Sequence, residues 1–241
     1  TSYMIAMLAK GKKKIGFARV DEKKNRLGFV LGVKLETDWV RDGINQVFRF
    51  LDSVKPLGCS ISIDEIKQMR IGLSDEDIAF GNAYAAVNFP DKSKLVFGFH
   101  PGGGNNKYIW DVNNYFELIK KSYERYNPYI LITSGFLDKE ITDKLESKLQ
   151  EENIPYIYNK DMDAYGLAAV LRHVSVYVTN NTGVMHLAAF TGSNTVSVFL
   201  KGDTAEWQPL YNKSKCVESK TDSINSITVD EVFEKITELN F

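Results

Sequence analysis

Residues 174–200 read VSVYVTNNTGVMHLAAFTGSNTVSVFL: alternating apolar residues, then small polar ones, then a second periodicity, then alternation again. In the middle part Val184, Leu187, Ala188 and Thr191 recur at helical spacing, and Gly192 follows as a residue that ends helices. The pattern predicts a strand at 174–179, a helix, and a second strand at 195–200. Two strands joined through a helix indicate a parallel βαβ unit.

Similar apolar runs precede this stretch. They occur at LVFGF (95–99), YILIT (129–133) and PYIYN (155–159), and segments with helical periodicity separate most of them. Short, nearly continuous apolar strands are typical of a parallel sheet that helices cover on both faces. The sequence therefore predicts a doubly wound, Rossmann-like α/β domain.

A linker is predicted at NFPDKSK, residues 88–94, because the regular strand–helix alternation begins only after it. We therefore expect a partial N-terminal domain at residues 1–90 and a C-terminal domain at residues 91–241. In the first, KIGFA (14–18) predicts a strand, and Asp38 is expected to cap a helix.

Two helix starts follow from capping-box spacing. Ser74 with Asp77 predicts a helix over residues 74–87, and Thr228 with Glu231 predicts the last helix of the chain.

Bulk composition narrows the class of protein. Of 241 residues 44% are hydrophobic, enough for a buried core, and 30 basic against 31 acidic residues argue against general nucleic-acid binding. Cys59 and Cys216 are far apart and indicate reduced thiols, as expected in the cytoplasm. No apolar run approaches the roughly 20 residues that span a bilayer. The opening TSYMIAMLAK resembles the inside of a helix, so we expect a fragment of a longer protein.

The first candidate loop is FHPGGGNNKYIW, residues 99–110. Gly102, Gly103 and Gly104 allow a ligand to approach the backbone amides, and Lys107 adds a positive charge. The loop is neither a P-loop nor a dinucleotide-binding GxGxxG motif. The alternative is a glycine loop without a binding role.

The second candidate loop joins the strand and the helix of the opening stretch. Asn181 or Thr182 is expected to be the N-cap, and Gly183 places no side chain before the first helical amides. Such a helix N-terminus attracts phosphate. His186 lies within the first turn and can face the same ligand, although a lone histidine on a helix is often structural.

The third candidate loop is FLKGDTAEWQPLY, residues 199–211. For Asp203 in this loop, a structural role and a ligand-binding role are equally consistent with the sequence. Asp138 and Glu140 follow YILITSGF, and carboxylates at such positions often only cap the next helix. Because ligands of open α/β sheets bind beyond the carboxyl ends of the strands, the three loops together predict a phosphate or nucleotide site.

A family resemblance emerges from these motifs. NNTGVMHLAAFTG is similar to the Asp-(Ser/Thr)-Gly-Pro-Met-His-Leu-Ala-Ala signature of the heptosyltransferase family, glycosyltransferase family 9. GFHPGGGNNKYIWDVNNYFELI resembles its His-Pro-Gly loop, and VFLKGDTAEWQP resembles its Phe-Gly-Pro-Thr-Asp…Trp-x-Pro segment. The motifs occur in the family's order along the chain.

The resemblance implies a GT-B architecture and inverting transfer of heptose from ADP-heptose to a lipopolysaccharide-core acceptor, without a metal or other cofactor. It implies a cytoplasmic protein that acts on a lipid-linked saccharide, with loose attachment to the inner membrane allowed. Thr182, Gly183 and His186 would contact the diphosphate or sugar, Lys107 the leaving ADP, and Glu140 or Asp138 the nucleoside. The donor-binding residues implied are Gly103, Gly104, Lys107, Glu140, Asn181, Thr182, Gly183, His186 and Asp203.

The sequence also departs from the family. Asn181 replaces the signature Asp, and no segment matches the loop that carries the family's catalytic Asp, so we predict no catalytic residue. Two hypotheses follow: a glycosyltransferase, or a homologue that binds nucleotide sugars as a scaffold without turnover. A Rossmann-type oxidoreductase is the third, and the missing GxGxxG motif disfavours it.

Overall fold

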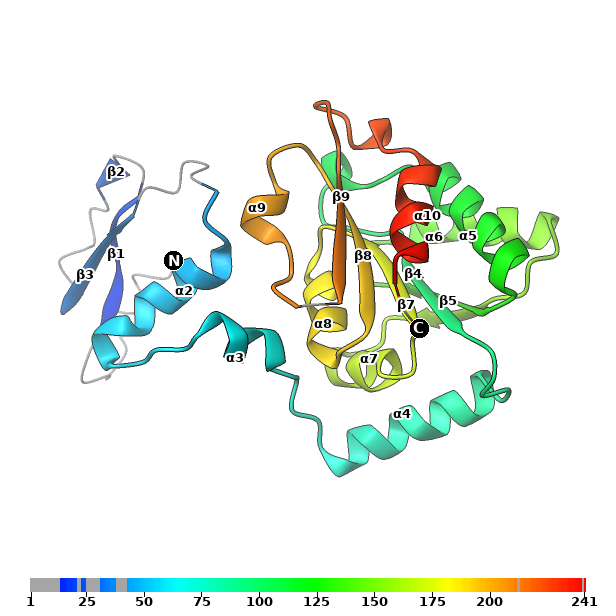
Figure 1. Ribbon diagram of the computed structural model, residues 1–241, viewed down its shortest axis with the longest axis horizontal. Coiled ribbons are helices and arrows are strands. Elements are labelled where there is room, and N and C mark those ends of the chain that lie inside the picture. The colour runs from blue at the N-terminus through cyan, green and yellow to red at the C-terminus, as the bar shows by residue number, and fades with distance from the viewer. Residues whose placement is uncertain (1–13, 21–22, 25–30, 38–42, 212, 240) are drawn as a thin grey trace. The chain divides into compact units, whose positions relative to one another are not determined.

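The computed structural model describes residues 14–20, 23–24, 31–37, 43–211, 213–239 and 241, which form two compact units (Figure 1). The first unit contains the chain up to Ser62 together with Ala205–Trp207, and the second contains Ile63–Thr204 and Gln208–Phe241. The second unit therefore begins before the linker expected at residues 88–94, because helix α4 (Asp75–Asn88) packs on a helix of that unit.

The first unit has a small mixed sheet. Strand β1 (Ile15–Val20) pairs in parallel with β3 (Val33–Thr37) and antiparallel with the two-residue β2 (Lys23–Lys24). The strand predicted at 14–18 is thus confirmed. Helix α2 (Gln46–Val54) begins with Asn45 as its N-cap, whereas Asp38, the expected cap, lies outside the described residues.

The second unit is built on six parallel strands. Their order across the sheet is β6 (Ile157–Lys160), β5 (Tyr129–Ser134), β4 (Val96–His100), β7 (Val176–Asn180), β8 (Asn194–Phe199) and β9 (Ser214–Glu218). The chain starts at β4, proceeds to one edge, and returns to add β7 on the other side of β4. This is the strand order of a doubly wound Rossmann-type sheet, which confirms the predicted fold class. All five predicted strands are present, with ends shifted by one or two residues.

Helices cover both faces of this sheet (Figure 1). Helices α4, α7 (Ala164–Leu171) and α8 (Gly183–Thr191) lie on one face, and α5 (Val112–Tyr126), α6 (Lys139–Glu151) and α10 (Val229–Thr237) lie on the other. The short helices α3 (Ile63–Gln68) and α9 (Thr204–Trp207) lie in connecting segments.

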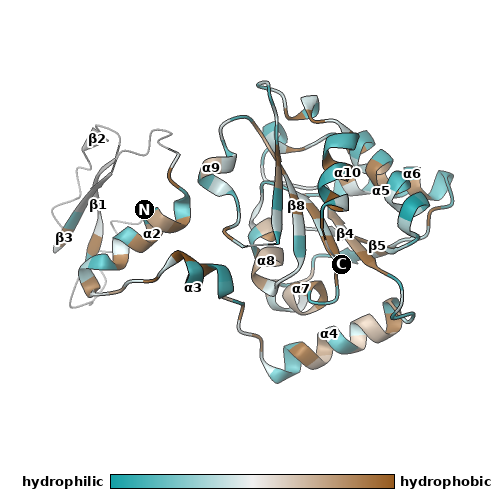
Figure 2. Ribbon diagram, in the orientation of Figure 1, coloured by the Kyte–Doolittle hydropathy of each residue, from teal (hydrophilic) through white to brown (hydrophobic). Residues whose placement is uncertain are grey.

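Each face of the sheet has its own apolar core, visible as hydrophobic strands and helix sides in Figure 2. On the side of α5, Phe97, Phe99 and Trp110 are fully buried. On the side of α7, Leu131 and Tyr177 are fully buried. Among the described residues, no helix has the length and apolar character needed to cross a membrane.

Local sequence explains how several helices begin and end. Ser74 and Asp77 form a complete capping box at the start of α4, as do Thr228 and Glu231 at the start of α10, and both confirm the prediction. Helix α8 ends at Gly192, whose φ of 90° is the left-handed conformation that glycine adopts without strain.

Candidate functional site

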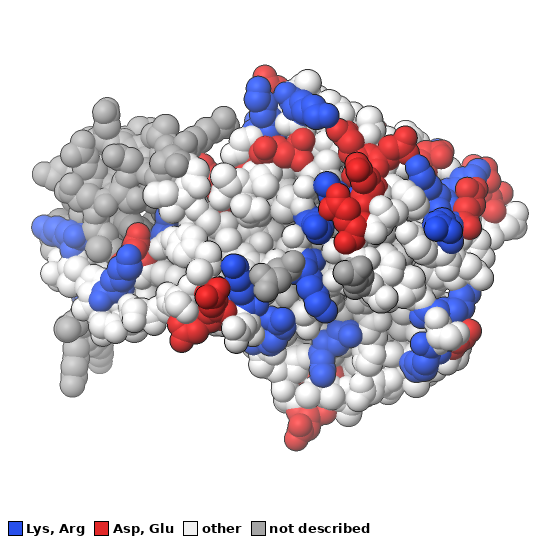
Figure 3. Space-filling model, in the orientation of Figure 1, with Lys and Arg blue, Asp and Glu red and all other residues white. Residues whose placement is uncertain are grey.

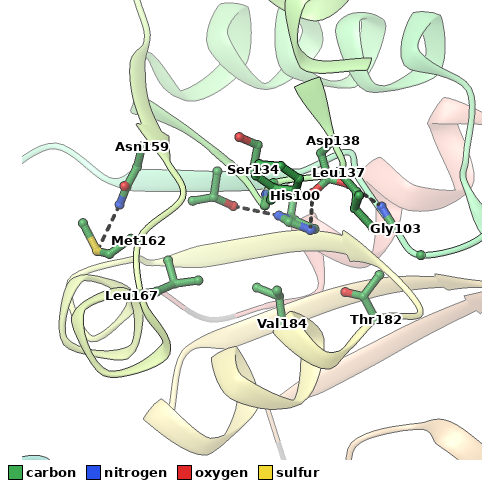
Figure 4. A pocket seen from close by; sticks show the side chains of 14 residues that line it. His100, Gly103, Ser134, Leu137, Asp138, Asn159, Met162, Leu167, Thr182 and Val184 are labelled. Atoms are coloured by element: carbon green, nitrogen blue, oxygen red, sulfur yellow. Dashed lines mark hydrogen bonds and ion pairs between the residues drawn. The ribbon is translucent and has the colours of Figure 1, made fainter. Parts of the chain in front are cut away.

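The candidate site lies where the strand order reverses. Loops leaving the carboxyl ends of β4 and β7 diverge, because the chain continues from them to opposite sides of the sheet. A cavity of about 290 Å³, here called the switch-point cavity, opens between them (Figure 4). Its walls come from the ends of four neighbouring strands: His100, Gly103, Gly104, Thr133, Ser134, Gly135, Phe136, Leu137, Asp138, Asn159, Met162, Leu167, Thr182 and Val184.

The glycine loop after β4 is held from one side by Asp138. The Gly103 amide donates a 3.0 Å hydrogen bond to Oδ1 of this buried carboxylate, and the Gly135 amide donates one of 2.7 Å to Oδ2. A Cβ at position 102 would lie 2.0 Å from Cγ of Asp138, so only glycine admits the carboxylate here.

From the other side the glycine loop is held by Asn180, the last residue of β7. Its Nδ2 donates to the carbonyls of Pro101 (2.9 Å) and Gly102 (2.8 Å), while its Oδ1 accepts from the Trp110 amide (3.0 Å). Asn180 has no solvent exposure. Its amide therefore satisfies three backbone groups that burial would otherwise leave unpaired.

Buried polar side chains on the cavity wall contact one another, and Figure 4 shows the contact between His100 and Asp138. Nε2 of His100 lies 3.6 Å from Oδ2 of Asp138, its Nδ1 lies 3.1 Å from Oγ1 of Thr133, and that hydroxyl lies 2.6 Å from Oη of Tyr177. Burial lowers the pKa of His100, against the opposing effects of the Asp138 charge and the contact with Thr133. Burial likewise raises the pKa of Tyr177, so its phenol stays protonated.

The N-terminus of α8 lies beside the cavity. Thr182 is the N-cap, one of the two residues that the sequence allowed, and Asn181 is not. The Thr182 side chain makes no capping hydrogen bond and lines the cavity instead. Gly183 is exposed, and a Cβ there would meet nothing within 4 Å. The first amides of the helix are therefore not capped by the Thr182 side chain, and position 183 has no side chain to cover them. An anion can approach these amides.

His186 is half-buried on α8. Burial lowers its pKa, so the imidazole is neutral at pH 7. Within the described part of the chain it makes no hydrogen bond or ion pair.

The donor-binding residues predicted from sequence differ in which hollow they line. Gly103, Gly104 and Thr182 line the switch-point cavity. Glu140 lines an adjoining hollow of about 300 Å³, here called the side hollow, where Lys144 pairs with it at 2.7 Å. The predicted residues outside both linings are Lys107, Asn181, Gly183, His186 and Asp203.

Three of these have identifiable surroundings. Lys107 is exposed, with its Nζ 5.6 Å from the ring of Tyr108. Asp203 occupies the N-cap position of α9 without a capping bond from its side chain. Asn181 is half-buried next to the cavity-lining Thr182.

Several lining residues were not predicted from sequence. The apolar part of the wall includes Met162, Leu167 and Val184, with Phe136 and Leu137 at 86% and 80% exposure. Phe136 and Leu137 are two adjacent apolar residues that follow the buried strand YILIT, and this pair was the indication of an apolar wall that the sequence offered. Large exposed apolar groups often mark binding surfaces. A cavity with apolar walls beside open amides suits a ligand that has both a flat ring and an anionic group.

Comparison with known proteins identifies the family. The sequence profile of glycosyltransferase family 9 (heptosyltransferase) matches residues 1–236 of this chain. The chain belongs to glycosyltransferase family 9.

Relatives of this family 9 chain include lipooligosaccharide heptosyltransferase 2 of Campylobacter jejuni, which is 23% identical over 124 residues. That match covers 50% of this chain and 38% of the curated relative, so the chain matches well under half of that protein's length.

Solved structures share the fold of this family 9 chain. A glycosyltransferase family 9 protein of Veillonella parvula has a TM-score of 0.74 at 13% identity, covering 98% of this chain and 76% of the other. An E. coli heptosyltransferase solved with ADP has a TM-score of 0.66 at 16% identity, covering 93% and 65%. These similarities support the GT-B-type α/β architecture predicted from the sequence.

Proposed function

We propose that this chain is a heptosyltransferase-type glycosyltransferase whose C-terminal domain binds the nucleotide sugar. The donor is ADP-heptose, and the acceptor is a saccharide of the lipopolysaccharide or lipooligosaccharide core. The observation that carries the proposal is the switch-point cavity, where glycine-loop residues and an open helix N-terminus meet at the carboxyl ends of β4 and β7.

The diphosphate of the donor would bind at the start of α8. The amides that follow Thr182 are not covered by a capping side chain, and the helix dipole favours negative charge there. The exposed Gly104 allows close approach from the opposite wall. Lys107 lies on the same loop, and its flexible side chain is the candidate cation for the leaving ADP. With these groups the diphosphate needs no bridging metal.

The nucleoside would lie along the apolar wall. Met162 and Leu167 face the cavity from the segment after β6, and Phe136 and Leu137 come from the loop after β5 (Figure 4). A purine ring buries apolar area against such a wall. Glu140, in the adjoining side hollow, is the candidate for contact with the ribose hydroxyls.

The sugar would extend from the diphosphate towards Asn181 and His186. A neutral imidazole and a carboxamide can each donate and accept hydrogen bonds, which suits sugar hydroxyls. Asp203 is proposed as a further contact. The catalytic base and the acceptor site are not assigned to any residue of this chain, and inversion at the anomeric carbon follows only from the family resemblance.

The proposed acceptor also implies where in the cell the protein acts. A lipid-linked acceptor made on the cytoplasmic side of the inner membrane would bring the protein there, with loose association at the surface. The C. jejuni relative named a lipooligosaccharide heptosyltransferase supports this acceptor class.

A second candidate function is a homologue that binds nucleotide sugars without transferring them. The observation that favours it is Asn181, which replaces the family's signature Asp and removes a negative charge.

Isothermal titration calorimetry with ADP, ADP-heptose, UDP and UDP-glucose tests the binding step. We expect saturable binding of ADP and ADP-heptose and weaker binding of the uridine nucleotides. Gly104→Trp, which fills the cavity mouth from a position with open space around it, should abolish binding. Val87→Trp adds comparable bulk at a 78% exposed position on α4 and should leave binding unchanged. A folded chain that binds none of the four ligands would overturn the proposal.

A separate assay tests the transfer step. Release of ADP from ADP-heptose in the presence of a deacylated core saccharide, followed by chromatography, distinguishes the two candidate functions. Binding without release supports the scaffold.

A further inference from the structure

A further hollow lies at the opposite ends of the strands of the same sheet. Its volume is about 350 Å³, and it is lined by Arg70, Ile71, Leu73, Ile78, Arg172, Phe190 and Thr191. Arg172 directly follows α7, and Thr191 is the last residue of α8, so the hollow lies near the amino ends of β7 and β8. The switch-point cavity lies at the carboxyl ends of the strands and shares no residue with it. We call this hollow the arginine pocket.

Arg70 is held in a fixed position at this pocket. Its Nη1 donates to the carbonyls of Lys67 (3.2 Å) and Met69 (2.7 Å), and its guanidinium lies 5.8 Å from the ring centre of Tyr211. Gly192 makes room for it, since a Cβ at that position would lie 3.0 Å from Nε of Arg70. The next residue is anchored as well, by a 3.1 Å bond from the Ile71 amide to the Phe190 carbonyl. The cation is therefore organised before any ligand arrives.

Arg172 supplies a second cation from the end of α7. Among the described residues, no carboxylate forms an ion pair with Arg70 or Arg172. Asp77 precedes the lining residue Ile78, but its carboxylate accepts hydrogen bonds from the amide and hydroxyl of Ser74 in the capping box of α4. Basic side chains gather over the region of α7 and α8 in Figure 3. Neither guanidinium therefore has a carboxylate within ion-pair distance in the part of the chain that the structure describes.

The helix dipole explains the position of only one of the two arginines, Arg172. A cation at the end of α7 stabilises the partial negative charge of that helix end, which is a sufficient structural reason for Arg172. Arg70 comes from the segment between α3 and α4, and its contacts orient it towards the same hollow. Two guanidinium groups on one hollow match the oxygens of a phosphate, which accept hydrogen bonds from such planar donors. Ile71, Leu73 and Phe190 add an apolar wall for a group attached to the phosphate.

We propose that the arginine pocket binds a phosphate group that carries an apolar substituent. The phosphate belongs either to a soluble phosphate ester or to the headgroup of an anionic lipid. We expect binding here to be independent of the nucleotide-sugar site, because the two sites share no lining residue and lie at opposite ends of the strands.

Two-dimensional ¹H–¹⁵N NMR titration of the chain with inorganic phosphate and with hexyl phosphate tests the site. We expect saturable shifts of the Ile71 and Gly192 amides, with tighter binding of hexyl phosphate. Arg172→Gln and Arg70→Gln should each weaken binding by about tenfold, since each removes a charged hydrogen-bond donor. Arg125→Gln makes the same charge change on α5, at the other face of the sheet, and should leave the affinity unchanged.

Three results would overturn the proposal: no saturable shift near the pocket, unchanged affinity in Arg172→Gln, or an equal loss in Arg125→Gln. Arg172 is exposed and makes no side-chain bond among the described residues, so its variant keeps the test valid if Arg70→Gln fails to fold. Shifts confined to Gly103 and Gly104 would report the nucleotide-sugar site instead, which keeps the two proposals separable.

Sedimentation with vesicles identifies the source of the phosphate. Binding to phosphatidylglycerol vesicles but not to phosphatidylcholine vesicles, lost in Arg172→Gln and kept in Arg125→Gln, supports the lipid headgroup. Phosphate and hexyl phosphate binding without vesicle binding supports a soluble ester. Vesicle binding that Arg172→Gln retains would exclude the lipid source.

Discussion

The backbone amide of Gly103 donates a 3.0 Å hydrogen bond to Oδ1 of Asp138, and this bond joins the loops that follow β4 and β5. The two residues are 35 positions apart in sequence. The second carboxylate oxygen binds the Gly135 amide, so one buried side chain fixes two walls of the switch-point cavity.

Asp138→Ala is expected to destabilise the protein by about 2–4 kcal/mol, because two partly buried amides lose their charged acceptor. Asp138→Asn keeps one acceptor oxygen and should cost less. Urea unfolding measures both. Asp143→Asn, at an exposed position of α6, is the control and should change stability by less than about 0.5 kcal/mol. An Asp138→Ala protein as stable as the original would show that this carboxylate does not hold the loops together.

Gly102→Ala should disrupt the same contact from the other side. The new Cβ would meet Cγ of Asp138 at 2.0 Å, so the carboxylate or the loop must move. We expect a loss of about 1–3 kcal/mol in stability and weaker ADP binding, measured by urea unfolding and calorimetry. Gly104→Ala places its Cβ in open space and provides the matched control for stability. Equal stability of the two variants would argue against close packing at position 102.

Adjacent asparagines should respond differently to substitution. Asn180→Ala leaves the Pro101 and Gly102 carbonyls and the Trp110 amide without their partner, and we expect a loss of about 2–4 kcal/mol in unfolding free energy. Asn181→Ala is expected to change stability by less than about 0.5 kcal/mol and to weaken nucleotide-sugar binding instead. Thermal or urea unfolding of both variants, paired with calorimetry, checks this division. A stable Asn180→Ala protein would contradict it.

Stability should fall as the pH drops below about 6.5. The pKa values of His100, His173 and His186 are all lowered in the folded protein, with burial as the largest cause. The unfolded chain therefore takes up protons first, and each histidine contributes up to about 1.4 kcal/mol per pH unit until its folded-state pKa is reached. Above about pH 7.5 both states are neutral at these groups, and the effect vanishes.

Urea unfolding at pH 7.5 and pH 5.5 measures this slope. Carboxylates such as Glu231, whose pKa is lowered to about 2, change protonation below this window and do not interfere. His186→Gln should reduce the pH dependence, since this residue makes no hydrogen bond within the described part of the chain. A protein whose stability is constant between these two pH values would refute the assignment of lowered pKa values.

Much of the fold was predictable from local pattern. The five predicted strands, the capping boxes of α4 and α10, and the end of α8 at Gly192 depend on residues within a few positions of each other. The sixth strand, β9, was missed because SKCVE is short, half-exposed and largely polar, as an edge strand can be. Its place in the sheet comes from pairing with β8.

The candidate site was only partly predictable. Gly103, Gly104 and Thr182 were found because glycine loops and helix N-caps have recognisable local sequences. Asn180 and Asp138 were not assigned their loop-holding contacts, since their partners lie 78 and 35 residues away. The assignment of Glu140, Asn181, His186 and Asp203 to the donor remains a prediction.

The sequence by itself determined the parallel α/β class, the starts of α4 and α10, the end of α8 and the family, because periodicity, capping and motif order are properties of neighbouring residues. Only the tertiary structure decided that Asp138 faces inward to the glycine loop, and that Arg70 and Arg172 border one hollow. The reason is physical: such contacts join segments that are distant along the chain, and only the packing of the sheet and its helices brings them within bonding distance.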